Sequence, residues 1–200
     1  NDNTIKLWGI QNNYEIKTLN KHTDIVNSVS FSLDSKMLAS ASSDNTVKIW
    51  NINTGKEIYT LKGHTSHVWN ISFSPDGKTL ASTSRDRTLK LWNINTGKEI
   101  KTLKGHTNLV YGASFSPDGR TLVSVSGDNT IKLWHINTGS EIKTLKGHKG
   151  AVIGARFSTD GQTLFSVSKD NTVISWNLDL DDLLERGCSL VKCSLGETQH

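Results

Sequence analysis

The sequence predicts an all-β fold built from repeated four-stranded antiparallel sheets, and three observations support this prediction. Tryptophan recurs every 42 residues, at Trp8, Trp50, Trp92, Trp134 and Trp176. Short β-rich segments alternate with turn residues, which is typical of sheets joined by tight turns. No long amphipathic stretch that could build a helical bundle occurs before residue 178, and only 34% of the 200 residues are hydrophobic.

Two further residue types recur at the same 42-residue interval, so the tryptophan spacing is not accidental. These series are Asp2, Asp44, Asp86, Asp128 and Asp170, and His22, His64, His106 and His148. The chain is therefore an internal repeat.

The first predicted strand of a unit spans residues 68–73, and its apolar positions show an irregular alternation. Val68, Ile71 and Phe73 change parity once, and the other units repeat this change at the same place. A parity change at a fixed position indicates a β-bulge, which adds one residue and re-aims the side chains that follow.

The rest of the unit reads as three more strands separated by turns. Ser74-Pro75-Asp76-Gly77 predicts a turn, because Pro presets φ and Gly tolerates positive φ. The expected second, third and fourth strands are residues 79–84, 88–93 and 99–103. A four-stranded unit cannot bury both of its faces alone, so it needs to be stacked on similar units. Radial stacking gives a β-propeller, which also covers most strand edges.

The unit resembles a WD repeat. The resemblance rests on Gly-His, an apolar first strand, Ser-Pro-Asp-Gly, and an Asp followed six residues later by Trp, and it covers nearly everything from Asn1 to Trp176. Segments such as Leu-Lys-Gly-His-Thr resemble those of bacterial, particularly cyanobacterial, members of the family. The residue after each Trp departs from the family's Asp, being Gly9, Asn51, Asn93, His135 and Asn177.

The resemblance implies a buried, hydrogen-bonded tetrad of His, Ser, Asp and Trp in each blade. By motif position the tetrads are His22, Ser40, Asp44 and Trp50; His64, Ser82, Asp86 and Trp92; His106, Ser124, Asp128 and Trp134; and His148, Ser166, Asp170 and Trp176. Such a set satisfies polar groups that would otherwise be costly to bury. We expect it to be structural.

The resemblance also implies a partner-binding face, formed by positions that flank the first-strand bulge or precede the tetrad Asp. The residues expected there are Ile25, Asn27, Ser43, His67, Trp69, Arg85, Leu109, Tyr111, Gly127, Ala151, Ile153 and Lys169. These positions vary between units while the framework around them does not. Trp69 lies outside the 42-residue series, so either it binds a partner or it fills a gap between blades.

The predicted division of the chain follows the repeat. Residues 1–20 supply the last two strands of a preceding blade; residues 22–61, 64–103 and 106–145 are full blades; residues 148–178 are three strands of a last blade; and residues 179–200 are a tail with a short helix, then disorder. Family rings are commonly seven-bladed, so we expect a C-terminal piece of a longer array, an incomplete ring or open arc. The isolated chain then either self-associates through its open blade faces or is only marginally stable.

The sequence predicts no catalytic residue, metal site or cofactor. The Ser-His-Asp set occurs four times in equivalent positions, which indicates a structural role, whereas a hydrolase needs one exposed nucleophile. His64 and His67 have no Cys or carboxylate partner at ligand spacing, and Cys188 and Cys193 have no second pair. The few cysteines and the lack of a signal sequence or apolar span predict a cytoplasmic location.

The predicted function is a non-catalytic scaffold for protein or peptide partners, with no small-molecule substrate and no membrane, and with a sensor or docking role in a larger signalling protein. An alternative is a regulatory or structural segment of an enzyme whose catalytic domain lies upstream. A weaker alternative is nucleic-acid binding through Arg85, Arg87 and Lys169. The net charge of +4 comes from evenly spread lysines, which favours a solvated surface instead.

Overall fold

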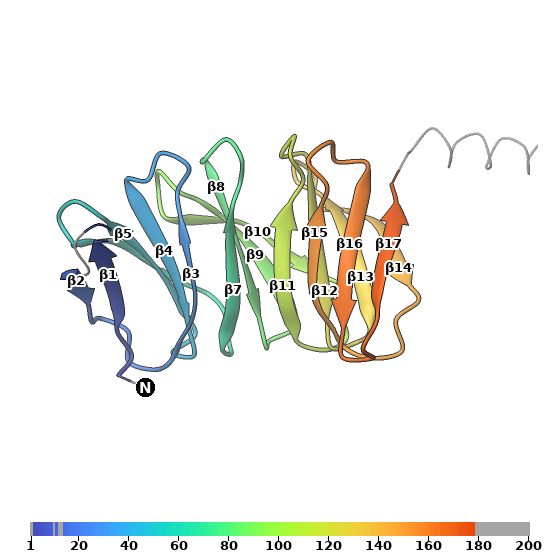
Figure 1. Ribbon diagram of the computed structural model, residues 1–200, viewed down its shortest axis with the longest axis horizontal. Coiled ribbons are helices and arrows are strands. Elements are labelled where there is room, and N and C mark those ends of the chain that lie inside the picture. The colour runs from blue at the N-terminus through green and yellow to red at the C-terminus, as the bar shows by residue number, and fades with distance from the viewer. Residues whose placement is uncertain (1, 10, 12–13, 179–200) are drawn as a thin grey trace, which may run out of the picture.

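The computed structural model describes residues 2–9, 11 and 14–178, and these form β-strands joined by turns (Figure 1). A two-stranded half-blade consists of β1 (Ile5–Gly9) and β2 (Tyr14–Leu19). The first blade consists of β3 (Val26–Phe31), β4 (Met37–Ser42), β5 (Thr46–Asn51) and β6 (Glu57–Lys62). The second consists of β7 (Val68–Phe73), β8 (Thr79–Ser84), β9 (Thr88–Asn93) and β10 (Lys98–Lys104).

The third blade consists of β11 (Val110–Phe115), β12 (Thr121–Ser126), β13 (Thr130–His135) and β14 (Glu141–Lys146). The last blade has three described strands, β15 (Val152–Phe157), β16 (Thr163–Ser168) and β17 (Val173–Asn177). All pairings are antiparallel and follow chain order within each sheet. The prediction of four-stranded antiparallel blades is confirmed. The sheets stand side by side as an open arc (Figure 1). The helix and disorder expected for residues 179–200 lie outside the described residues.

The predicted first-strand bulge is present in every blade. The register between first and second strands shifts at Val26/Ser28, Val68/Asn70, Val110/Gly112 and Val152/Gly154. The bulged residues are therefore Asn27, Trp69, Tyr111 and Ile153. Because a bulge leaves one residue unpaired and bends the strand, these side chains can lean toward the next blade.

A second bulge, which the sequence patterns did not indicate, lies between the third and fourth strands. In the first blade Trp50 pairs with Glu57 and Ile49 pairs with Tyr59, so Ile58 has no partner residue. Ile58 is exposed, as are its equivalents Ile16, Ile100 and Ile142. This bulge explains why one isoleucine per blade faces solvent at the outer edge.

The tight turn between the second and third strands requires a residue with positive φ. The position is Asn45, Asn129 and Asn171 in three blades, with φ of 68°, 67° and 66°. Arg87 holds it in the second blade, at φ 70°. Asn visits the left-handed region readily, whereas a long side chain such as Arg is strained there.

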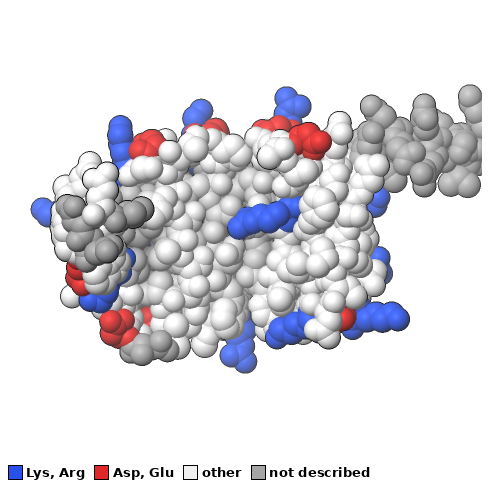
Figure 2. Space-filling model, viewed as in Figure 1, with Lys and Arg blue, Asp and Glu red and all other residues white. Residues whose placement is uncertain are grey.

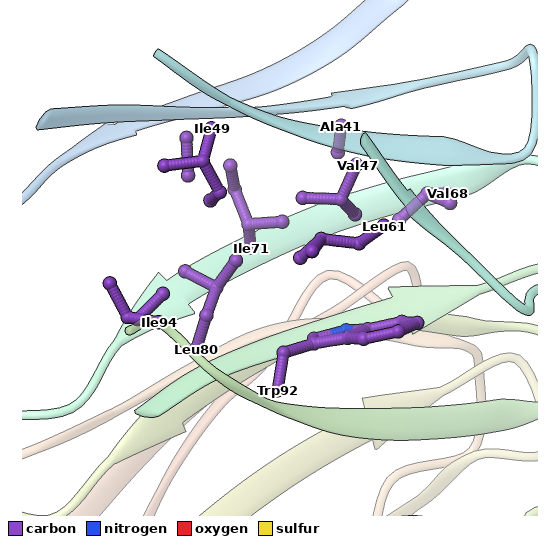
Figure 3. Packing of buried hydrophobic residues seen from close by; sticks show 10 residues of the cluster. Ala41, Val47, Ile49, Leu61, Val68, Ile71, Leu80, Trp92 and Ile94 are labelled. Atoms are coloured by element: carbon purple, nitrogen blue, oxygen red, sulfur yellow. The ribbon is translucent and has the colours of Figure 1, made fainter. Parts of the chain in front are cut away.

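The core lies between blades rather than within them. In the cluster shown in Figure 3, Ala41, Val47 and Ile49 of the first blade face Leu80 and Trp92 of the second. The small Ala41 lets the sheets approach closely. The same arrangement recurs between the second and third blades and between the third and last blades. Burying each large apolar side chain contributes about 1.5–3 kcal/mol, so each blade is stabilised mainly by its neighbours.

Long side chains on the fourth strand add a polar tie to the next blade. Lys17 Nζ donates to the Ile52 carbonyl at 3.0 Å, and Tyr59 Oη donates to the Asn95 carbonyl at 2.8 Å. Lys101 Nζ donates to Asn137 O at 2.7 Å. These donors lie 42 residues apart, so the tie belongs to the repeat.

Candidate functional site

The second blade shows how one buried tetrad is connected. His64 Nδ1 lies 2.8 Å from Asp86 Oδ2, and His64 Nε2 lies 2.8 Å from Ser82 Oγ. The indole N–H of Trp92 donates to the same Ser82 Oγ at 2.8 Å. Ser82 is fully buried and His64 is nearly so, which places a continuous hydrogen-bond chain inside the blade.

The other three sets are brought together in the same way. Their histidine–aspartate distances are 2.7 Å for His22–Asp44, 2.8 Å for His106–Asp128 and 3.0 Å for His148–Asp170. The indoles of Trp50, Trp134 and Trp176 each donate to the blade's serine at 2.8 Å, and these serines are Ser40, Ser124 and Ser166.

The order of hydrogen-bond donors and acceptors in the tetrad fixes the histidine tautomer. Serine Oγ already accepts from the indole N–H, so its own proton is free to be donated to histidine Nε2. A neutral imidazole protonated at Nδ1 can accept that proton and donate to the aspartate. A second proton on Nε2 would remove the short acceptor of the serine hydroxyl and leave at best a distant carbonyl, such as Lys48 O at 3.5 Å from Ser40 Oγ, so the network favours neutral histidine.

The pKa values of two described histidines agree with this assignment. Burial holds the pKa of His106 below its usual value of 6.5, and the attraction of Asp128 only partly opposes it; His22 is affected in the same sense by burial and Asp44. Burial acts to raise the pKa of Asp128, but hydrogen bonds from Thr130, Thr107 and His106 outweigh it and lower that pKa to about 2. Both groups therefore stay in their network-forming state at neutral pH.

The tetrad aspartate also holds the loops that lead to the surface. Asp86 Oδ2 accepts the backbone N–H of Thr65 at 3.0 Å, and Asp86 Oδ1 accepts from the N–H and hydroxyl of Thr88 at 2.9 and 2.7 Å. The turn between Ser84 and Thr88 is thereby fixed, with Arg85 and Arg87 exposed on it. A structural core thus positions surface side chains.

A second polar network per blade escaped the sequence reasoning. Lys90 Nζ donates to Glu99 at 2.8 Å and to the Thr102 hydroxyl at 2.7 Å, and Lys90 is nearly buried. Equivalent sets are Lys48, Glu57 and Thr60, and Lys132, Glu141 and Thr144. The repeated Glu-Ile-x-Thr of the fourth strand and the Lys two residues before Trp50, Trp92 and Trp134 were the available signals.

The expected binding residues gather on one edge of the arc, which we call the bulge face. It is formed by Ile25, Asn27, Ser43, His67, Trp69, Arg85, Leu109, Tyr111, Gly127, Ala151, Ile153 and Lys169. Backbone hydrogen bonds join its two segments in every blade: Ser43 N to Ile25 O, Arg85 N to His67 O, Gly127 N to Leu109 O and Lys169 N to Ala151 O. The bulge face is the lower edge of Figure 1, where the first strands begin.

The bulged residues step across this face from blade to blade. Asn27 Nδ2 donates to the Val68 carbonyl of the second blade at 2.9 Å. The ring of Trp69 lies 6.4 Å from the Tyr111 ring of the third blade, and Lys169 of the last blade lies 5.3 Å above Tyr111. Asn27, Trp69 and Tyr111 thus each contact the next blade. Ile153, with no next blade described, is exposed.

Trp69 takes part in both packing and surface formation. It is half-buried and also contacts His67, at 6.5 Å between ring centres. Its indole N–H is buried without a hydrogen-bond partner. Leaving such a donor unpaired costs about 1–3 kcal/mol, which an aliphatic side chain filling the same gap would not incur. Gap filling alone therefore does not account for a tryptophan here.

Ser43 is buried and Ile25 and Lys169 are exposed, while Leu109, Gly127 and Ala151 are intermediate. The bulge face thus offers its most continuous surface from Arg85 to Lys169. In contrast, the wall formed by the four first strands has one charged residue, Arg156, and Figure 2 shows it almost free of charge.

Two features are absent from the part of the chain that the structure describes. No group of three or more His, Cys, Asp or Glu side chains there could hold a metal ion. No helix in it has the length and hydropathy needed to cross a membrane. Cys188 and Cys193 lie outside this part.

We predict that acid destabilises the fold in two steps. Because the pKa of His106 and of His22 is lower in the folded chain than its ordinary 6.5, the unfolded chain binds protons first as pH falls below about 6.5. The free energy of unfolding should therefore decrease from pH 7.5 to 5.5, measured by urea denaturation. It should decrease again below pH 3.8, where Asp128 becomes protonated only in the unfolded chain.

His106→Gln should reduce the decrease in the free energy of unfolding between pH 7.5 and 5.5, since glutamine does not titrate. His135→Asn is the matched control, because Asn51 and Asn93 occupy the equivalent position. It should leave the free energy of unfolding at pH 7.5 close to that of the parent chain. Stability that is constant or rises from pH 7.5 to 5.5 would contradict the neutral-histidine assignment.

Comparison with protein families gives one match. The model described as WD40 (WD domain, G-beta repeat) matches residues 13–51, 55–93, 97–135 and 139–177, which is more than half of the chain. A search of curated proteins found no match. The matched stretches run from a fourth strand to the next third strand and keep the 42-residue spacing. Together with the blade architecture, they show that the chain belongs to the WD40 repeat family.

Proposed function

We propose that this chain is a non-catalytic scaffold that binds protein or peptide partners through its bulge face. WD40 repeats generally mediate protein–protein interaction. The observation that carries the proposal is the Trp69–Tyr111 pair, two half-buried aromatic residues in contact across a blade boundary, next to exposed Arg85 and Lys169.

Variation among the blades supports this assignment. The tetrad residues are the same in all four blades, but the bulged residue is Asn27, Trp69, Tyr111 or Ile153. A position with a purely structural task has no reason to differ in this way. Trp, Tyr and Arg are also the residue types enriched among those that dominate binding energy at protein interfaces.

The buried tetrads argue against catalysis at the Ser-His-Asp sets. Each serine is fully buried and its hydroxyl is engaged by both His and Trp, so a substrate cannot reach it. WD40 repeat domains are typically non-catalytic. A regulatory segment of an enzyme with an upstream catalytic domain could use the same face; that alternative, the signalling context and the cytoplasmic location stay predictions.

The test is a double variant, Trp69→Asn and Tyr111→Ile, which installs residues the chain already has at the equivalent positions Asn27 and Ile153. Affinity capture from an extract of the source cells, read by quantitative mass spectrometry, should lose at least one specific partner. The expected loss is tenfold or more, equivalent to about 1.4 kcal/mol.

The matched control is Ile58→Ala and Ile100→Ala, which removes exposed apolar side chains from the outer edge. It should capture the same partners as the parent chain. A partner set that is identical for the face variant and the parent, with both folded by circular dichroism, would contradict binding through the bulge face.

Self-association through the exposed end of the last blade is a second interaction that specific residues favour. Phe165, Val167 and Val173 are 49%, 41% and 67% exposed. The equivalent Ala39, Ala41 and Val47 of the first blade are fully buried by the second blade. No described residue covers this apolar surface, and a second copy of the chain can cover it.

Sedimentation velocity over a rising concentration series checks this. The parent chain should show a dimer or larger species, and Phe165→Ala with Val173→Thr should shift it toward the monomer. Ile58→Thr with Ile142→Thr, which changes exposed side chains elsewhere, should have no effect. A monodisperse parent monomer at all concentrations would contradict self-association.

A further inference from the structure

The bulge face and the adjoining turn at Arg87 contain cations that have no carboxylate partner among the described residues. Arg85, Arg87 and Lys169 are exposed, and among the residues that the structure describes none of the three forms an ion pair. Lys169 instead lies over the ring of Tyr111, with its Nζ 3.4 Å from the phenol oxygen. The nearby Asp86 is already engaged by His64 and three donors of Thr65 and Thr88.

On the opposite edge Lys78 and Arg120 form no ion pair among the described residues, but each lies close to an exposed carboxylate. Lys78 follows Asp76 by two residues, and Arg120 follows Asp118 in the same way; each carboxyl pKa is lowered by hydrogen bonds, first from Ser74 or Ser116, and further by its neighbouring cation. The carboxylates next to the cations of the bulge face, Asp86 and Asp170, are instead held by the tetrad histidines and by backbone and threonine donors. Figure 2 shows basic side chains along the corresponding lower edge.

The backbone at Arg87 carries strain that a simpler residue would avoid. At the equivalent turn position the other repeats have Asn3, Asn45, Asn129 and Asn171, all at positive φ. Arginine at φ 70° costs more than asparagine there. Strain retained at an exposed position indicates a use for the side chain, and here the side chain adds a second cation beside Arg85.

The cations and the aromatic residues lie in one row across three blades. Arg85 is hydrogen-bonded through its backbone to His67, which contacts Trp69; Trp69 contacts Tyr111; and Tyr111 contacts Lys169. The row therefore has basic ends and an aromatic middle. An extended segment with an apolar centre and acidic flanks matches this order.

We propose that the row from Arg85 to Lys169 binds an acidic peptide segment that has an apolar or aromatic residue between its carboxylates. This inference rests on the proposed function and names the chemistry of the partner. Nucleic acid fits less well, because tight phosphate-backbone binding needs many contacts and this face offers three unpaired cations interrupted by neutral side chains.

Fluorescence anisotropy with defined peptides tests the proposal on the full chain. The probe is a labelled peptide with a leucine–phenylalanine pair flanked by glutamates. Comparison peptides have glutamine or lysine flanks. A thymidine oligonucleotide with the same charge as the acidic peptide tests nucleic-acid binding. The acidic peptide should bind at least fivefold tighter than the glutamine peptide, and added salt should weaken it.

The decisive variant is Arg85→Ser with Arg87→Asn, which uses the equivalent residues Ser43 and Asn45. The control is Lys78→Gln with Arg120→Gln, which uses the equivalent Gln162 and removes two cations from the other edge. Each pair lowers the net charge from +4 to +2 (4 − 2 = 2). The face variant should bind the acidic peptide about fivefold more weakly, and the control should bind it as the parent does.

Equal affinity for acidic and glutamine peptides, equal losses in the two variants, or tighter binding of the oligonucleotide would each overturn the proposal. The proposed function can be separated from it. If the parent chain binds the acidic and the glutamine peptide with equal affinity, and Trp69→Asn with Tyr111→Ile abolishes the binding of both, the bulge face binds peptides without a preference for acidic ones.

Discussion

The structure depends on one buried serine hydroxyl per blade, which accepts from an indole and donates to an imidazole. That hydroxyl links the third strand, through Trp, to the loop before the first strand, through His. The histidine in turn holds the aspartate that fixes the turn after the second strand. A sheet of four short strands is marginal alone. The polar chain gives each sheet one defined geometry, so that its apolar surfaces face its neighbours in a fixed register.

Repetition of that geometry separates two tasks. Inside the blades, the residue type is constrained because buried polar groups need hydrogen-bond partners. Between the blades, it is constrained because Ala, Val, Leu and Trp side chains pack closely. The bulged residues and those before the tetrad aspartate lie at the edge of the packed region, where different side chains can be accommodated. Asn27 hydrogen-bonds to the next blade, whereas Trp69 and Tyr111 contact it through their rings. Chemical variety is therefore concentrated on the bulge face, next to cations that lack internal partners.

Much of the fold could be predicted because its signals are local and repeat in register. The strands expected at residues 68–73, 79–84 and 88–93 match β7, β8 and β9, and the first-strand bulge follows from the parity of Val68, Ile71 and Phe73. The bulge beside Ile58 and the network of Lys90, Glu99 and Thr102 could not be found in this way. Both depend on the pairing register of two strands, which periodicity alone does not define. The row of Trp69, Tyr111 and Lys169 needed the spatial order of three blades.

The stability of two adjacent buried hydroxyl variants tests the tetrad account most directly. Ser82 and Thr83 are both fully buried, but Ser82 links His64 and Trp92, whereas the Thr83 hydroxyl has no partner. By urea denaturation, Ser82→Ala should lower the free energy of unfolding by roughly 2–4 kcal/mol, since two buried groups lose their partner. Thr83→Val, which matches Val125 and Val167 in other blades, should leave stability unchanged or raise it. Equal losses in the two variants would contradict the central role of the serine.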